Sequence, residues 1–261
     1  MNTTERKTLA VCMIAHNEAD KIKTALDSVQ FADQLVVVDC QSDDNTADVA
    51  SQSGAQVFKR PNLRDLNVNK NFSFDQAQTD FILCLDADEV IPQETREEII
   101  SILSAKRSEV AYFIPRCNHW KGQWLKHGGN YPDRQLRLFK HGSARFPEKH
   151  LHERLQVQGK IGYLRHPMHH FPYQNSAECQ RKLDFYTSFE ADHLHKQGVS
   201  PSWWVYLRLM IWMPLQRLLR RYIFKMGFLD GKAGWEAVLM DMQNFRLRYQ
   251  KLSNLSSGRT E

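Results

Sequence analysis

Two aspartates at alternate positions, Asp86 and Asp88, directly follow the apolar run 81–85, so both carboxylates could face one cation. Carboxylate oxygens suit Mg²⁺ or Mn²⁺, which usually keeps water ligands and shares its coordination with the phosphates of a substrate. Paired acids in loops are also common as solvated residues, so the pair alone leaves that alternative open. A third acid, Asp39, ends another apolar run, where it could bind a ligand or cap a strand. The acids together predict a Mg²⁺ or Mn²⁺ site whose natural partner is a nucleotide diphosphate.

The elements that carry these acids alternate between strand and helix. Such alternation predicts an α/β fold with a doubly wound, mostly parallel sheet, Rossmann-like, whose ligands bind beyond the carboxyl ends of the strands. Neither G-x-G-x-x-G nor G-x-x-x-x-G-K-[ST] occurs, which argues against a dehydrogenase and a P-loop enzyme. The apolar patterns predict strands at 9–15, 35–39, 55–59 and 81–85 and helices at 70–78 and 92–105.

The second half of the chain has a different pattern of apolar residues. Short apolar pieces at 135–140, 151–157 and 161–164 predict strands and loops, and helical spacing returns over 176–197 and 234–252. We therefore expect a domain over residues 1–172 and a helical C-terminal extension over 173–261. Arg134 and Arg137 could clamp anionic groups or be solvated. Five histidines could be ordinary hydrogen-bonding residues or could bind a metal or a phosphate: His150, His152, His166, His169 and His170.

Composition narrows the class of protein further. The 261 residues are 42% hydrophobic and 25% charged, as in an ordinary globular chain. The five cysteines form no C-x-x-C pair, which indicates reduced thiols used as small apolar residues in an intracellular protein. No apolar stretch precedes Leu9, so we expect no export by a signal peptide.

The basic charge is concentrated near the C-terminus, where residues 200–261 hold 10 Lys and Arg against 4 Asp and Glu. The segment 203–224 combines three tryptophans with arginines and contains no acid. The arginines interrupt it too often for a spanning helix. It could lie on an anionic membrane surface, or it could pack on the sheet domain with its arginines solvated. We expect the membrane surface, with no nucleic-acid partner, and assign the headgroup contacts to Arg208, Arg217, Arg220 and Arg221.

Several stretches resemble a known family. The first three are Cys12-Met-Ile-Ala-His-Asn-Glu18, Val36-Val-Val-Asp-Cys-Gln-Ser-Asp-Asp-Asn-Thr46 and Leu85-Asp-Ala-Asp-Glu89, and together they resemble glycosyltransferase family 2, with the GT-A fold. The likeness continues through 131–139, 151–153 and 227–231. That longer pattern is similar to the lipopolysaccharide core β-1,4-glucosyltransferase group.

The resemblance implies a function and a set of roles. The chain would be an inverting, metal-dependent transferase that moves a hexose, glucose, from UDP-glucose to a lipid-linked oligosaccharide acceptor, the lipopolysaccharide inner core. It would work in the cytoplasm, peripheral at the inner face of the inner membrane. Glu153 would be the catalytic base, with Asp133 in reserve. The implied donor-binding residues are Ala15, Asn17, Glu18, Asp39 and Asp86, and the implied ligands of Mg²⁺ or Mn²⁺ are Asp88, Asp86 and His170.

Two positions depart from the family pattern. Cys40 stands where many members have a second Asp, and Gln41 stands where they have Gly. We expect Asn45 to supply the left-handed turn that the glycine often provides. A polymer synthase is disfavoured, because the chain has neither spanning helices nor a Q-x-x-R-W signature. The alternative function is a non-catalytic adaptor that binds nucleotide sugars or a membrane, which would need Asp39 and Asp88 but not Glu153.

Overall fold

The computed structural model describes residues 6–63, 65–147 and 154–258. These residues form two compact units. The first comprises the described residues of Met1–Arg116 and Arg134–His170, and the second those of Cys117–Asp133 and Phe171–Glu261.

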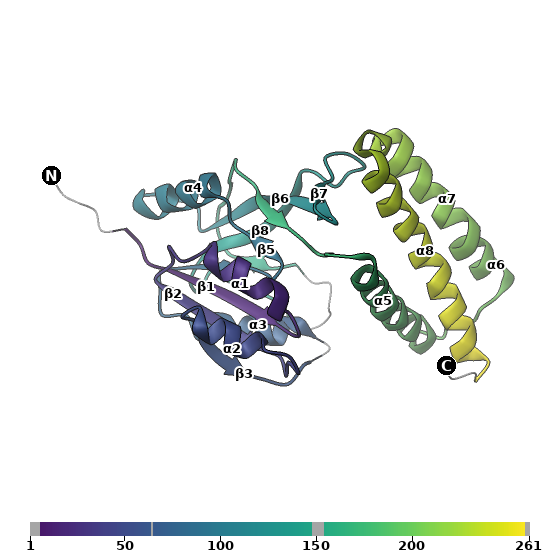
Figure 1. The fold of residues 1–261 in the computed structure, drawn as a ribbon, viewed down its shortest axis with the longest axis horizontal. Coiled ribbons are helices and arrows are strands. Elements are labelled where there is room, and N and C mark those ends of the chain that lie inside the picture. The colour runs from purple at the N-terminus through teal and green to yellow at the C-terminus, as the bar shows by residue number, and fades with distance from the viewer. Residues whose placement is uncertain (1–5, 64, 148–153, 259–261) are drawn as a thin grey trace. The chain divides into compact units, whose positions relative to one another are not determined.

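The first unit is built on a mixed sheet (Figure 1). Its strands follow the order β3-β2-β1-β4-β8-β6-β12-β5. The first four are mutually parallel, whereas β8 runs antiparallel to β4. The predicted α/β fold with a mostly parallel sheet is confirmed. The strands of this order are β1 (Leu9–Ala15), β2 (Gln34–Asp39), β3 (Gln56–Lys59), β4 (Phe81–Cys84), β5 (Glu89–Val90), β6 (Ala111–Trp120), β8 (Asp133–Lys140) and β12 (Met168–His170).

Four short strands complete the β-structure of the described residues. β11 (Ile161–Tyr163) runs parallel to β6, and β7 (Gln123–Trp124) pairs with the end of β6. β9 (Ala144–Arg145) and β10 (Gln156–Val157) form a separate antiparallel pair.

Strand β1 is central because both of its faces are apolar. Leu9, Val11 and Met13 are almost fully buried in the core on one face, together with residues of α1 and α4. Ala10 and Cys12 point to the opposite face, as alternate residues of a strand must, and join Phe74 of α3. Helices therefore cover both faces, and the acids at the strand ends stand on a rigid edge. The helices of this unit are α1 (Ala19–Asp27), α2 (Thr46–Gln52), α3 (Leu66–Asp75) and α4 (Gln93–Ser104).

Helix α3 begins earlier than the expected 70–78 and ends at Asp75. Asp65 caps its first turn by accepting a hydrogen bond from the Asn67 N–H at 3.0 Å. Ahead of the apolar Phe74, its buried side is lined by amides: Asn69 donates to the Pro61 carbonyl, and Asn71 makes two hydrogen bonds with the backbone of Phe146. The apolar pattern missed this first turn because the helix packs through hydrogen bonds.

The second unit is mainly helical (Figure 1). Helix α8 packs against α5 and against a continuous helical segment over residues 203–224. Among the described residues, no helix is both long enough and apolar enough to span a membrane. The elements are α5 (Ser176–Lys196), α6 (Trp203–Tyr206), the π-helical stretch η1 (Leu207–Trp212), α7 (Met213–Arg217), the π-helical stretch η2 (Leu218–Phe224), the 3₁₀ turn η3 (Gly227–Asp230) and α8 (Gly231–Ser256).

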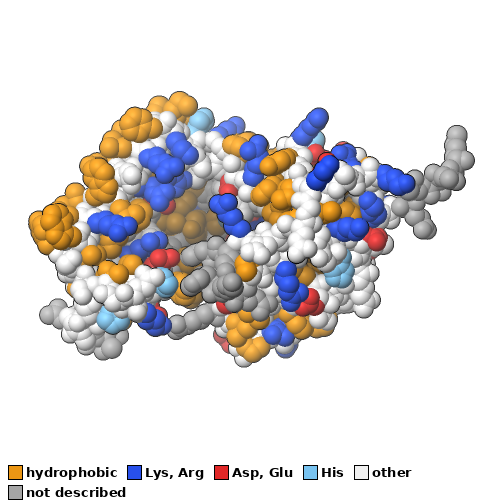
Figure 2. Space-filling view, turned by 180° about the vertical axis from the view of Figure 1, so that it is seen from behind, with side chains coloured by type: hydrophobic (Ala, Val, Ile, Leu, Met, Phe, Trp, Pro, Cys, Tyr) orange, Lys and Arg blue, Asp and Glu red, His pale blue; other side chains and the backbone are white. Residues whose placement is uncertain are grey.

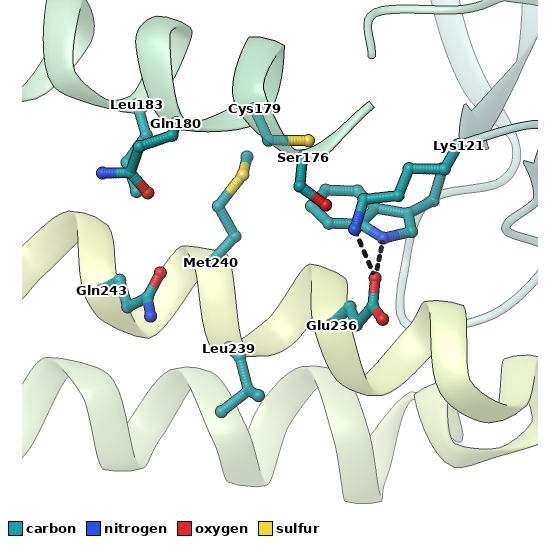
Figure 3. A pocket seen from close by; sticks show the side chains of 10 residues that line it. Lys121, Ser176, Cys179, Gln180, Leu183, Glu236, Leu239, Met240 and Gln243 are labelled. Atoms are coloured by element: carbon teal, nitrogen blue, oxygen red, sulfur yellow. Dashed lines mark hydrogen bonds and ion pairs between the residues drawn. The ribbon is translucent and has the colours of Figure 1, made fainter. Parts of the chain in front are cut away.

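Two acids tie the loops of this unit to its helices. Asp230 is buried and accepts hydrogen bonds from the N–H groups of Lys126 and His127 and from the His127 ring. Glu236 of α8 accepts from the Trp120 indole at 2.8 Å and from the Lys121 ammonium at 2.9 Å. Figure 3 shows this bridge at the rim of a pocket of about 220 Å³ that α5 and α8 border. Asp230 therefore gives the Gly227–Gly231 stretch a structural role.

Candidate active site

The loops that follow β1 and β2 are joined by hydrogen bonds. Asn17 and Gln41 both have positive φ angles, of 56° and 54°. The Asn17 N–H donates to the Ser42 hydroxyl at 3.0 Å, and its side-chain oxygen accepts from the Asp43 N–H at 2.8 Å. The left-handed turn expected at Asn45 is wrong, because Asn45 has a φ of −79° and Gln41 takes that conformation. The two loops form one rigid border along the sheet edge.

The other donor-binding residues expected after β1 lie on the same border. Ala15 stands opposite Asp39 in the parallel register, and its carbonyl accepts from the Cys40 N–H at 2.8 Å. The Glu18 N–H donates to the Thr46 hydroxyl at 2.9 Å, and the Glu18 carboxylate lies 3.2 Å from the Lys21 ammonium. The structure therefore places Ala15, Glu18 and Asp39 together.

Asp39 carries an unused hydrogen-bond acceptor in a buried position. Its side chain is 3% exposed, and one carboxylate oxygen accepts from the Ser42 N–H at 3.4 Å. The other oxygen, Oδ1, is buried and has no hydrogen-bond partner among the described residues. An unsatisfied buried acceptor costs about 1–3 kcal/mol, so a partner outside the described residues would stabilise it. A hydroxyl or an N–H group of a bound ligand would satisfy Oδ1.

The turn after β4 is held from beneath by a network of buried charges. The Glu89 N–H donates to the Asp86 carbonyl at 3.0 Å and closes the turn. Glu89 is fully buried, and its carboxylate accepts from Arg137 at 2.7 Å, from Arg116 at 3.1 Å and from the Asp86 N–H at 3.1 Å. Arg137, which is 6% exposed, also forms an ion pair with the Asp86 carboxylate. This network fixes the backbone that carries Asp88.

Asp86 is paired with two cations. Besides Arg137, the Lys70 ammonium of α3 lies 2.8 Å from its carboxylate. Burial alone would raise the pKa of Asp86, but Arg137 and Lys70 outweigh it and hold that pKa well below its usual range. Burial would likewise lower the pKa of Lys70, yet the attraction of Asp86 leaves it raised. Asp86 is therefore a fixed anion within this network.

Asp88 and His170 lie together at the other side of the turn. His170 on β12 is the register partner of Glu89 on β5, which brings its ring next to the turn. The Nε2 atom of His170 is 3.5 Å from the Asp88 carboxylate, and both side chains are largely buried. Among the described residues, no group of three or more His, Cys, Asp or Glu side chains could hold a metal ion. The pair still fits Mg²⁺ or Mn²⁺, which is often bound by one or two protein groups and completed by substrate phosphates and water.

The remaining predicted residues do not join this site in the described part of the chain. Glu153, His150 and His152 lie outside the described residues. Asp133 accepts a hydrogen bond from the Asn118 amide at 3.0 Å within the second unit. His166 pairs with Glu98 at 3.0 Å, so it does not share the partner of His170.

Sequence reasoning missed the charged support of the turn. Lys70 and Glu89 were given no role, and Arg137 was considered only as a clamp for anions or as a solvated residue. A signal was present for Arg137, since it lies within the run Leu136–Phe139, where a charge is unexpected. Its partners could be found only from the pairing of β8 with β4.

Comparisons with known proteins indicate the family to which this chain is related. The profile described as glycosyl transferase family 2 matches residues 10–170. An uncharacterized glycosyltransferase of Rickettsia prowazekii is 29% identical over 262 residues, covering 96% of this chain and 88% of that protein. The lipopolysaccharide core biosynthesis glycosyltransferase LpsC of Rhizobium meliloti is 24% identical over 202 residues, covering 75% of each.

Solved structures are similar at a greater distance. Residues 1–349 of TarS from S. aureus match 96% of this chain and 92% of that one, at 14% identity and a TM-score of 0.45. Glucosyl-3-phosphoglycerate synthase from Mycobacterium tuberculosis, in complex with Mn²⁺, UDP and glucosyl-3-phosphoglycerate, matches 43% of this chain and 44% of that one, at 21% identity and a TM-score of 0.37. On the match of the family profile to most of the chain, the protein belongs to glycosyl transferase family 2.

Proposed function

We propose that the chain is an inverting hexosyltransferase that moves glucose from UDP-glucose to a lipid-linked glycan. The observation that carries this proposal is the buried, unpartnered Oδ1 of Asp39, at the same sheet edge as the Asp88–His170 pair. A carboxylate oxygen in that position accepts a hydrogen bond from a ribose hydroxyl or from the N–H of a base. Ligands of open α/β sheets bind at such strand ends.

Of the three expected metal ligands, Asp86, Asp88 and His170, we propose that Asp88 and His170 hold the metal, because Lys70 and Arg137 occupy the Asp86 carboxylate. A divalent ion bound there would neutralise charge on the departing diphosphate. Asp86, already occupied by Lys70 and Arg137, would keep the turn in place and hold Lys70 near the diphosphate. The turn and its support contain three acids, Asp86, Asp88 and Glu89, and three cations, Lys70, Arg116 and Arg137, whose charges balance. The positive charge that matches the anionic diphosphate would therefore come from the metal.

The base that accepts the proton of the acceptor hydroxyl is proposed to be Glu153, with Asp133 in reserve. Inversion requires a group that removes this proton while the acceptor oxygen attacks the anomeric carbon from the face opposite the diphosphate. The C1–oxygen bond to the diphosphate breaks as the new glycosidic bond forms, and the proton passes to the carboxylate.

The acceptor is proposed to be the inner core of lipopolysaccharide, reached from the cytoplasmic face of the inner membrane. The Rhizobium meliloti relative LpsC is named as a lipopolysaccharide core biosynthesis glycosyltransferase, which supports this class of acceptor. No nucleic-acid partner is proposed.

Donor binding tests the proposal first. With Mn²⁺ present, UDP-glucose should bind more tightly than other nucleotide sugars in isothermal titration calorimetry. Asp39→Asn should weaken binding by about 10- to 100-fold, since a hydrogen bond to a charged group is worth about 1.5–3 kcal/mol. Asp43→Asn is the matched control, because Asp43 is exposed on the same loop and its carboxylate is not one of the proposed donor contacts. Equal affinity of the two variants would contradict the proposed role of Asp39.

Transfer to an extracted pool of lipid-linked acceptor tests the reaction itself. Formation of a glucosylated product together with release of UDP is the expected result. Binding of the donor without either hydrolysis or transfer would instead support the non-catalytic adaptor.

A further inference from the structure

The helical segment 203–224 exposes a row of large apolar side chains, which we call the docking face. Their exposed fractions range from 39% to 77%, far above what a packed helix shows. Figure 2 shows hydrophobic side chains interleaved with lysine and arginine along the edge of the helical unit, at the left of the view. Contiguous apolar patches of this kind on a soluble protein mark interaction sites. The face comprises Trp203, Trp204, Ile211, Trp212, Leu215, Leu219, Ile223 and Phe224.

The docking face runs straight because part of the segment is π-helical. Its residues recur every four positions, as in the series from Ile211 through Leu215 and Leu219 to Ile223. In a regular α-helix, four residues overshoot one turn by about 40°, so such a series would spiral around the helix. The wider turns of η1 and η2 absorb that overshoot. The backbone therefore keeps these side chains on one side.

The opposite side of the segment is occupied by the rest of the unit. Leu209 is buried there, and the segment packs on α8. Arg221 forms an ion pair with Asp241 of α8 and donates to the Gly128 carbonyl at 2.9 Å. The expected headgroup contact is therefore wrong for Arg221, which is a structural residue. Arg217 also contacts α8, because its guanidinium lies 3.9 Å from the Asp241 carboxylate.

The charges beside the docking face are all positive. Arg208 and Arg220 are exposed. They belong to the same series of every fourth residue as Trp204 and Trp212. Lys225 follows the last turn and is exposed as well. Residues 200–225 contain no Asp or Glu. An apolar row with adjacent cations and no acid matches the boundary between the headgroups and the acyl chains of an anionic bilayer.

We propose that the docking face inserts into an anionic lipid surface, with Arg208, Arg220 and Lys225 at the headgroups. A second copy of the chain is a poorer occupant, because a twofold interface through this face would bring the two sets of cations together. The proposal extends the proposed function by naming the surface that would bring the enzyme to a lipid-linked acceptor. The vesicle test does not measure sugar transfer, so the docking proposal and the proposed function can fail independently.

Co-sedimentation with vesicles tests the proposal. The full chain should sediment with vesicles of phosphatidylcholine and phosphatidylglycerol, more weakly with phosphatidylcholine alone, and less as salt is raised. Trp204→Ser with Trp212→Ser should reduce the partition coefficient at least tenfold, since each lost tryptophan removes a large apolar contact. Arg208→Glu with Arg220→Glu should reduce it at least about 25-fold on anionic vesicles, because each cation near such a surface is worth about fivefold.

A matched control comes from α5 of the same unit. Phe185 is 66% exposed and Arg181 is exposed, so Phe185→Ser with Arg181→Glu changes an aromatic residue and a charge away from the docking face. This variant should bind vesicles as the unmodified chain does. UDP-glucose binding and the melting temperature should stay unchanged in every variant. No binding to anionic vesicles, or equal losses in the control, would overturn the proposal; a dimer that the tryptophan changes dissociate, without vesicle binding, would assign the face to a second copy.

Discussion

Replacing Arg137 by Met tests whether the buried charges beneath the D-x-D turn hold the first unit together. The change keeps much of the apolar stem but removes the guanidinium that bridges Asp86 and the fully buried Glu89. Glu89 would be left with Arg116, at 3.1 Å, and Asp86 with Lys70. Removing one partner of a buried ion pair costs about 3–5 kcal/mol. For a unit of this size, that loss corresponds to a decrease in melting temperature of about 6–20 °C.

The matched control is an exposed ion pair in the same unit. Arg145 lies 2.7 Å from Asp75, and both side chains are at least half exposed. Arg145→Met should therefore cost at most about 1 kcal/mol, or a few degrees. Arg137→Lys should lie between the two, because a single ammonium cannot form the two-pronged contact of a guanidinium.

Thermal unfolding followed by circular dichroism, with donor binding as a second readout, measures these differences. Equal melting temperatures for Arg137→Met and Arg145→Met would refute the argument that the network supports the turn. A strongly destabilised Arg137→Met that binds the donor normally at low temperature would show that the network contributes stability alone.

Three further predictions follow from the site and the thiols. Asp88→Ala should abolish the increase in UDP-glucose affinity caused by Mn²⁺, as measured by calorimetry, and full turnover in excess chelator would contradict the metal role altogether. Glu153→Gln should leave donor binding intact and slow transfer by ~10²–10⁴; wild-type turnover would move the search to Asp133. Burial raises the pKa of Cys117 to about 11, so its thiolate fraction at pH 8 is on the order of 10⁻³ and its alkylation in the native protein should be slow, accelerating roughly tenfold per pH unit up to that pKa.

The elements that could be predicted from the sequence are those in which burial is apolar. Strand β1 was expected at its observed bounds, because both faces of a central parallel strand need apolar side chains. Helix α3 was misplaced, since Asn69 and Asn71 bury amides that an apolar pattern does not register. The positive φ of Gln41 was missed because glutamine rarely adopts it, and the turn is fixed by the neighbouring loop after β1.

The position of the acids at the sheet edge could be expected from the sequence, but the residues that they contact could not. Asp39 and Asp88 stand out as acids after apolar strands, so their place at the sheet edge follows from the α/β pattern. The pairing of Asp86 with Arg137 joins residues 51 positions apart, through strands whose adjacency no local pattern reveals. The direction of Arg221 depends on the π-helical turns, which also have no signature in the sequence.

Because of these π-helical turns, the docking face depends on the number of residues in the segment 203–224. The wide turns keep the two halves of the segment in phase only at its present length. Deleting one residue within the regularly wound α7 would remove one residue's share of the helical rotation. Everything downstream would then rotate by about 100° about the helix axis. Trp204 would keep its direction while Leu219 and Ile223 turned away from it, and Arg221 would lose Asp241. Side chains in this segment can therefore be exchanged more freely than its length can change, because its two halves share one face only while they remain in phase.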